Sequence, residues 1–276
     1  MLQKATSFAA GLFVTLALSA AVVSTAGAQW RVVDDDEWCR DRDYGDRDRG
    51  WYCEVRELTL AADRDPIAVD ADPNGGIRVE GWDRNEILVR AKVSGQSWTD
   101  EEARDLVSGV EVLTGGRMIE ARGPRGGRRE HWAVSYEIFA PMRSNLSLET
   151  TNGGITIEDV AGDIEFYTTN GGVRLLGVGG DVRGHTSNGG LHVELTGTEW
   201  QGDGMDVRTT NGGVRIEVPE DYSARLETGT TNGGLRFDFP VTVQGRLNRR
   251  LSVDLGSGGR LIRATTTNGG VVVRRR

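Results

Sequence analysis

Side chains of the types used in acid–base or metal chemistry are few in this sequence, and they match none of the common catalytic motifs. The three histidines, His131, His185 and His192, do not form the His-x-His or His-Glu-x-x-His patterns that bind zinc. Ser257 lies in a Gly-Ser-Gly-Gly stretch and lacks the Gly-x-Ser-x-Gly pattern of a hydrolase nucleophile. We therefore expect no catalytic residue, no cofactor and no metal site.

Two acidic residues, Asp163 and Asp181, occupy equivalent turn positions one repeat apart. Acidic turns stacked in this way bind calcium in β-rolls with the repeat G-G-x-G-x-D. Here the equivalent position of the next repeat is Gly204, with Asp203 beside it. A turn aspartate bonded to local backbone is the simpler interpretation, and the sequence leaves calcium binding open.

The N-terminus has the pattern of a secretory signal peptide covering residues 1–28. Lys4 precedes an apolar run over residues 8–23, and the small residues Ala26-Gly27-Ala28 suit cleavage before Gln29. The apolar run is short for a membrane span, and acidic residues follow it instead of a basic flank. We expect a periplasmic or extracellular protein without a transmembrane segment after cleavage.

The only cysteines, Cys39 and Cys53, would then face an oxidising compartment, where such a pair usually forms a disulfide. The residues between them are charged and rich in turn formers, so they cannot build a core. A disulfide closing this short loop would contribute about 3 kcal/mol. We predict that residues 29–65 form a charged segment held by this disulfide.

The remaining chain is dominated by a repeat of the type TTNGG. The repeat places asparagine at Asn152, Asn170, Asn188, Asn211, Asn232 and Asn268. The first two steps are 18 residues each, and the last is twice 18 and passes through a degenerate copy, GSGGRLI. An isolated early copy, DPNGGIRVE, begins at Asp72. A fixed period of this length is typical of solenoids.

Within each unit, apolar and other residues alternate with a period of two, which indicates strands. Ile155 and Ile157 point to one face, while Thr156 and Glu158 point to the other. One such unit buries little by itself, but stacked copies merge their apolar rows into one core. The sequence favours a parallel β-solenoid, while a sandwich of antiparallel hairpins stays open because Asn-Gly also suits hairpin turns.

The turn residues have a structural explanation in a stack. Glycine allows positive φ and close approach of two chains, and asparagine side chains of successive turns can bond one another as a ladder. The threonine before each turn can pair with its counterpart one repeat away. We therefore predict that the six repeat asparagines form a structural turn ladder.

The TTNGG units, with the intervening VAGDIEF and VGGDVRG, resemble the bacterial putative-adhesin family of secreted β-solenoid domains, which is catalogued mainly as a domain of unknown function. The resemblance covers residues 66–276. It implies a right-handed parallel β-helix in the cell envelope, and it carries no established catalytic residues to transfer.

Residues 66–145 are less regular than residues 146–276, and we interpret them as first rungs and a cap. Thr99 with Glu102 forms a capping box, which predicts one short helix over residues 99–108. Val271-Val272-Val273 would be the last strand, at an open end, with Arg274-Arg275-Arg276 either as a charged stop or as a basic tail for anionic lipid or glycan.

Charge and aromatic content restrict the function classes. The net charge of −8 argues against nucleic-acid binding. The tryptophans are scattered, without a stacking row along the repeats. Trp200 is the notable exposed candidate, and it could equally fold over the flank of the solenoid. Charged columns align across the repeats: Arg174, His192, Arg215 and Arg236, with Glu158, Glu194, Glu217 and Asp238 two residues further on. Columns of opposite charge offset each other and favour a solvated face.

The favoured function is an exported, non-catalytic binding, adhesion or scaffold module whose partner is an envelope protein or a glycan. An envelope-stress sensor acting through a protein partner and a polysaccharide-active β-helix enzyme are the alternatives. The sequence does not reveal the ligand or the oligomeric state.

Overall fold

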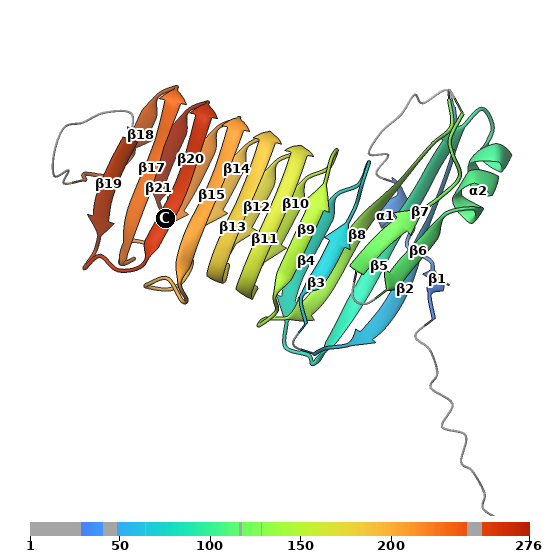
Figure 1. Cartoon of the computed structure of the whole chain (residues 1–276), viewed down its shortest axis with the longest axis horizontal. Helices are drawn as coiled ribbons and strands as arrows, with labels where there is room; N and C mark the ends of the chain where they lie inside the picture. The colour runs from blue at the N-terminus through green and yellow to red at the C-terminus, as the bar shows by residue number, and fades with distance from the viewer. Residues whose placement is uncertain (1–28, 41–48, 64, 116–117, 128, 242–249) are drawn as a thin grey trace, which may run out of the picture.

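The computed structural model describes residues 29–40, 49–63, 65–115, 118–127, 129–241 and 250–276. The predicted signal peptide, residues 1–28, lies outside this part. The described chain is built mainly from two sheets of eleven and ten strands, which run along an elongated molecule (Figure 1). Aliphatic side chains from both sheets form one continuous core.

Most of the molecule consists of rungs, each formed by one strand from each sheet joined through a turn of the Asn-Gly-Gly type. In chain order the rungs are β3 (Ile67–Asp70) with β4 (Ile77–Trp82), β9 (Leu146–Thr150) with β10 (Ile155–Glu158), β11 (Ala161–Asn170) with β12 (Val173–Leu176), β13 (Gly179–Asn188) with β14 (Leu191–Glu194), β15 (Gly204–Asn211) with β16 (Val214–Val218), β17 (Ala224–Asn232) with β18 (Leu235–Phe237), and β20 (Leu261–Asn268) with β21 (Val271–Arg275).

The rungs stack in parallel and in register, because equivalent residues of each copy lie side by side. Ile155 pairs with Ile77 on one side and with Val173 on the other, and fully buried Ile157 lies in the next inward row, between Val79 and Leu175. The predicted strand alternation is confirmed, and parallel stacking excludes the antiparallel sandwich. The fold is a two-sheet β-solenoid.

The last rung in the chain is not the last rung of the stack. β20 lies between β15 and β17, and β21 lies between β16 and β18. β19 (Arg250–Leu255) pairs antiparallel with β17 and forms the edge of its sheet (Figure 1). The expectation of an open C-terminal strand with a charged stop is therefore wrong, because Val271 and Val273 are buried between two neighbours.

The N-terminal end departs from the solenoid. β2 (Gly50–Ala61), β5 (Glu86–Ser97) and β8 (His131–Pro141) pair antiparallel, with β1 (Arg31–Val33) at the edge. In the other sheet, β6 (Glu111–Gly115) and β7 (Met118–Arg122) form an antiparallel pair. Residues 29–65 thus contribute a twelve-residue strand with buried Val55 and Leu58, which the charged composition of that segment did not predict.

Two helices occur among the described residues, where the sequence predicted one. α2 (Asp100–Ser108) begins at the Thr99–Glu102 capping box and packs Ala103 and Val107 inward against β2 and β5. The additional helix, α1 (Asp36–Arg40), lies against β2 and β5. In the described part of the chain, neither helix has the length and apolar character needed to span a bilayer.

Candidate functional site

The Asn-Gly-Gly turns form a continuous row along one side of the stack. Along this row, the Nδ2 of each asparagine after Asn74 donates to the Oδ1 of a neighbouring asparagine over 2.8 to 3.1 Å. The spatial order is Asn74, Asn152, Asn170, Asn188, Asn211, Asn268 and Asn232. The row includes Asn74 of the early copy, and it places Asn268 in the interior, not at the end.

The first glycine of each turn is required by close stacking. A Cβ added at Gly189 would lie 1.9 Å from the carbonyl oxygen of Gly171, whereas one added at Gly190 would meet nothing nearer than 3.6 Å. The turn glycines do not have positive φ, so the expectation of positive φ was wrong and that of close approach was right. The same Gly171 oxygen accepts a hydrogen bond from Thr186 Oγ1.

This threonine contact recurs along the stack and replaces the expected pairing between threonines. The Oγ1 atoms that donate to a glycine carbonyl of the neighbouring rung belong to Thr150, Thr168, Thr186, Thr209 and Thr266. All five residues are buried. The repeat threonines therefore help to hold the rungs together, with the exception of Thr230, whose Oγ1 has no hydrogen-bond partner among the described residues.

At the N-terminal end, a disulfide and a capped short helix replace the Asn-Gly-Gly turns as the stabilising features. The Cys39–Cys53 disulfide is present, with the two Cα atoms 5.7 Å apart, and it ties α1 to β2. Asp35 caps α1 by accepting a hydrogen bond from the backbone N–H of Trp38. That bond, opposed by burial and aided by the Arg90 guanidinium, holds the pKa of Asp35 below its ordinary value.

Arg90 connects three carboxylates next to Trp38. Its guanidinium donates to the carboxylates of Asp35, Glu57 and Glu137, and it lies 5.3 Å from the ring centroid of Trp38. Burial works against the charged form of Arg90, but these hydrogen bonds raise its pKa above the ordinary value. The three carboxylates and the guanidinium therefore stabilise one another beneath Trp38.

Next to this network the structure has an open cleft of about 850 Å³. Its lining includes Trp38, Arg49, Trp51, Gln96 and His131, and two stacked turns, residues 74–76 and 152–154, border it. Trp51, Gln96 and His131 occupy one register row across β2, β5 and β8. The cleft thus gathers tryptophans that are scattered in the sequence.

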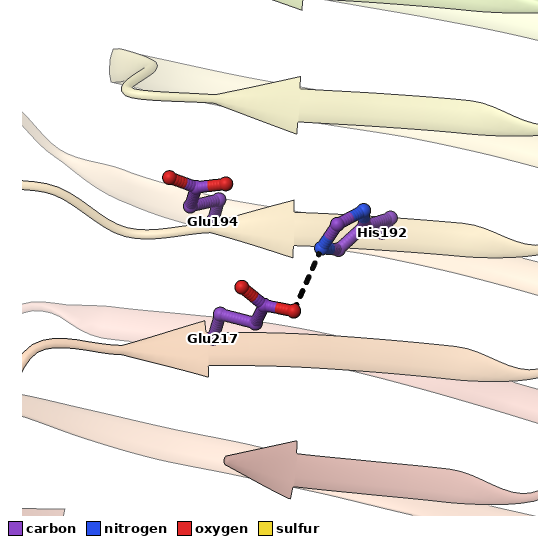
Figure 2. A group of neighbouring side chains, drawn as sticks. All are labelled: His192, Glu194 and Glu217. Atoms are coloured by element: carbon purple, nitrogen blue, oxygen red, sulfur yellow. Dashed lines mark ion pairs between the residues drawn. The ribbon is translucent and has the colours of Figure 1, made fainter. Parts of the chain in front are cut away.

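A second cluster lies on the outer face of the solenoid, where Figure 2 shows His192, Glu194 and Glu217 together. One ligand atom from each lies within 4.8 Å of the others, close enough for a single cation to contact all three. His192 Nε2 is 3.4 Å from Glu217 Oε1, an ion-pair separation without a hydrogen bond. This group was not predicted from the sequence. The repeat does align Glu194 with Glu217, and His192 precedes Glu194 by two residues, so the spacing offered a signal.

This cluster already has a cationic partner within the chain. The guanidinium of Arg276 donates to Glu194 and, over 3.0 Å, to the carbonyl oxygen of Leu195. Arg215 is the register neighbour of His192. A metal ion would have to displace Arg276 from Glu194, so the electrostatics disfavour metal binding in the intact chain.

The charged columns differ in part from the alignment made on the sequence. Arg215 and Arg236 are separated by Val272, because β21 lies between their strands. Leu176 likewise separates Glu158 from Glu194. The two columns of like charge predicted from the sequence are therefore interrupted, one by Leu176 and the other by Val272 of the displaced last rung.

The contacts of Trp200 and Asp181, which the sequence also marked as candidates, are with other parts of the protein. Trp200 is buried and donates from Nε1 to the carbonyl oxygen of Gly180, which agrees with a side chain folded over the solenoid and not with an exposed one. Asp163 and Asp181 lie side by side, with Gly204 next in the row as aligned. Asp181 is ion-paired with Arg183.

One family profile and several solved structures resemble this chain. The profile of the family described as Toastrack DUF4097 matches residues 130–274, and no curated protein matches the chain. Solved structures that resemble it are a putative cell adhesion protein from Clostridium sporogenes ATCC 15579 (9% identity, TM-score 0.41, covering 80% of this chain and 100% of that one) and a putative adhesin from Bacteroides fragilis NCTC 9343 (8%, 0.36, 80% and 97%). A putative lipid binding protein from Parabacteroides distasonis ATCC 8503 is also similar (9%, 0.23, 81% and 96%). Because the profile spans more than half of the sequence, this chain belongs to the Toastrack DUF4097 family.

Proposed function

We propose that this protein is an exported, non-catalytic binding module of the bacterial cell envelope, in which the solenoid is a rigid scaffold. The observation that carries the proposal is the direct bonding of each rung to the next through its turn. Asn188 and Thr186 both bond to the preceding rung, as their equivalents do in other rungs. A stack bonded in this way presents its surface with fixed spacing, which suits recognition of an extended partner.

The proposal includes the features expected from the N-terminal sequence. The mature chain begins at Gln29, in the periplasm or outside the cell, and the coil is right-handed. The Cys39–Cys53 disulfide supports an oxidising compartment, since such bonds are rare in the cytosol. The partner is an envelope glycan or protein.

A binding role is favoured over catalysis because the repeated residues stabilise the stack. The turn residues and the buried threonines are bonded to neighbouring rungs, and the cluster around Glu194 is bonded to Arg276. A polysaccharide lyase or hydrolase needs carboxylates or bases free to face a sugar.

The test is a pull-down of purified mature protein with peptidoglycan, outer-membrane and soluble periplasmic fractions, beside a screen for hydrolase and lyase turnover. We expect saturable binding to one fraction and no turnover. Turnover that a single carboxylate substitution abolishes would replace the proposal by the enzymatic alternative. Binding confined to one envelope protein, with no glycan component, would favour the sensing alternative.

A further inference from the structure

We propose that the N-terminal cleft is a binding site for a short, neutral oligosaccharide. This inference rests on the proposed binding function and assigns its ligand class and its site. Three features of the cleft carry it: two placed indole rings, polar side chains between them, and the pairing of Arg78 and Glu137 within the protein.

The indoles are brought together by the disulfide. Trp38 directly precedes Cys39 in α1, and Trp51 lies two residues before Cys53 in β2, so the bond between the cysteines holds both tryptophans at one cleft. Both rings are only half-buried. Trp38 is oriented by the Arg90 guanidinium, 5.3 Å from its ring centroid. Fixed, partly exposed indoles offer flat apolar surfaces with little loss of side-chain entropy on binding.

The floor between the rings and the turns is polar. Gln96 and Ser94 project from β5 on the face opposite to buried Val93, and His131 follows Gln96 in the register of β8. Amide, hydroxyl and imidazole groups donate and accept hydrogen bonds at the same site.

Of the three Arg and Glu side chains in the lining, Arg78 and Glu137 are paired within the protein, whereas Arg49 is paired with none of the described residues. Glu137 is bonded to Arg90, and Arg78 is paired with Glu80 at 3.2 Å and with Glu158 at 2.7 Å. A ligand with several negative charges would compete with these carboxylates. The cleft is therefore better matched to a neutral ligand than to an anionic one.

A sugar ring combines the required properties, because it has an apolar C–H face and a rim of hydroxyl groups. The C–H face stacks on an indole, and the hydroxyls bond to amide and hydroxyl side chains. The volume of about 850 Å³ lies in the upper part of the range of small-molecule sites. The open shape suits a chain that enters from the side of the Asn-Gly-Gly turns.

The experiment is isothermal titration of the mature, disulfide-bonded protein with neutral cellotetraose and chitotetraose, and with anionic tetragalacturonate. We expect wild-type protein to bind at least one neutral probe and to bind it more tightly than tetragalacturonate. Trp51→Ala and Gln96→Leu should each weaken binding about tenfold or more. The control is Trp98→Ala, since Trp98 is 60% exposed and does not line the cleft.

Circular dichroism and intact mass establish that each variant is folded and holds its disulfide, and Trp51→Phe, which keeps an aromatic ring, should retain part of the affinity. Preference for tetragalacturonate, no binding of neutral probes at millimolar concentration, or equal loss in Trp51→Ala and Trp98→Ala would overturn the inference. If wild-type protein and Trp51→Ala bind an envelope fraction equally well, the cleft assignment fails while the binding function stands. Failure of both proteins to bind any fraction counts against the function itself.

Discussion

At the scale of single residues, the outer face of the solenoid is governed by local pairing of charges. Glu194 and Glu217 are direct register neighbours on parallel strands, an arrangement of like charges that is unfavourable without a counter-ion. Within the chain, Arg276 supplies this counter-ion. His192 lies beside the pair and completes the set of possible metal ligands.

We predict that Arg276→Ala lowers the free energy of unfolding by up to about 1 kcal/mol, because Glu194 loses its partner at a partly exposed site. The same variant should gain affinity for Zn²⁺, since the competing guanidinium is gone. Thermal unfolding with Zn²⁺ and with a chelator measures both effects. Glu194→Gln in the Arg276→Ala background is the control and should lose the zinc effect, whereas an equal zinc shift in wild-type protein contradicts the prediction.

His185 gives the protein a pH-dependent component of stability. Burial, and secondly the charge of Arg208, hold the pKa of His185 below its usual 6.5, and Tyr167 packs beside its ring. Between the folded pKa and 6.5 the unfolded chain therefore binds a proton that the folded chain does not. This contribution is complete above 6.5 and is lost as the pH falls through the folded pKa.

We therefore predict that the free energy of unfolding decreases slightly from about pH 7 to about pH 5, and that His185→Gln removes this part of the decrease. Urea unfolding at both pH values measures the difference. Identical pH dependence in wild-type protein and His185→Gln would show that other groups account for the effect.

At the scale of elements, the turn is the unit that sets the spacing between rungs. The two glycines of one turn have different roles although the repeat preserves both. The first approaches the carbonyl oxygen of the neighbouring turn too closely for any side chain, and the second has room for one. This difference provides a matched pair of substitutions within two adjacent residues.

We predict that Gly189→Ala destabilises the protein by about 3 kcal/mol or more, because its Cβ would lie 1.9 Å from a backbone oxygen that cannot move alone. Gly190→Ala, with 3.6 Å to the nearest atom, should cost less than about 1 kcal/mol. Chemical denaturation of the two variants makes the comparison. Similar losses in both would mean that close stacking does not explain the first glycine.

The asparagine row supports a second prediction for the turns. Asn188→Ala and Asn268→Ala should each destabilise by about 1 kcal/mol, because both residues bond to neighbours on two sides but are solvent-exposed. Asn232→Ala should cost less, since Asn232 bonds to Asn268 alone within the row. Denaturant midpoints compare the three, and an effect at Asn268 smaller than at Asn232 would contradict the order of rungs.

At the scale of the whole molecule, the order of rungs in space differs from their order in the chain. Among the described strands, β18 pairs with β21 alone, and β17 pairs with β20 and the edge strand β19. The rung formed by β17 and β18 therefore depends on residues that follow it in the sequence.

We predict that truncation after Arg260 makes residues 224–237 sensitive to proteolysis, because β18 loses its partner and β17 loses its parallel neighbour. The rungs up to β16 should stay protected, since their stacking does not involve the deleted strands except at the new end. Limited proteolysis with mass spectrometry compares the truncated and full-length proteins. Continued protection of residues 224–237 would show that this rung docks elsewhere.

Much of the fold was determined by the sequence alone. The period of two in segments such as residues 155–158 predicts strands whatever their partners, and repetition of the unit predicts stacking, because one row of aliphatic side chains cannot bury itself. The resemblance to a secreted adhesin-like family is confirmed as family membership. The disulfide followed from two cysteines and the redox environment expected for an exported chain.

Only the tertiary structure decided which rung lies next to which. The inward-facing side chains of the rungs are similar to one another, so either β17 or β20 could pack beside β15. No local sequence pattern distinguishes these two strands. The strand over residues 50–61 was not predicted, because charged residues such as Arg56 interrupt its apolar pattern. Arg56 bonds to carbonyl oxygens at the end of α2. Contacts of this kind exist only after folding.

The candidate site was likewise decided by tertiary structure. Trp51, Gln96 and His131 are far apart in the chain and become one row only through antiparallel pairing of β2, β5 and β8. Sequence spacing reports neighbours within one strand or one repeat, whereas a cleft is lined by side chains from several elements. The solenoid could therefore be predicted from its period, but the cleft at its N-terminal end could not, because β2, β5 and β8, which supply much of its lining, do not follow the repeat.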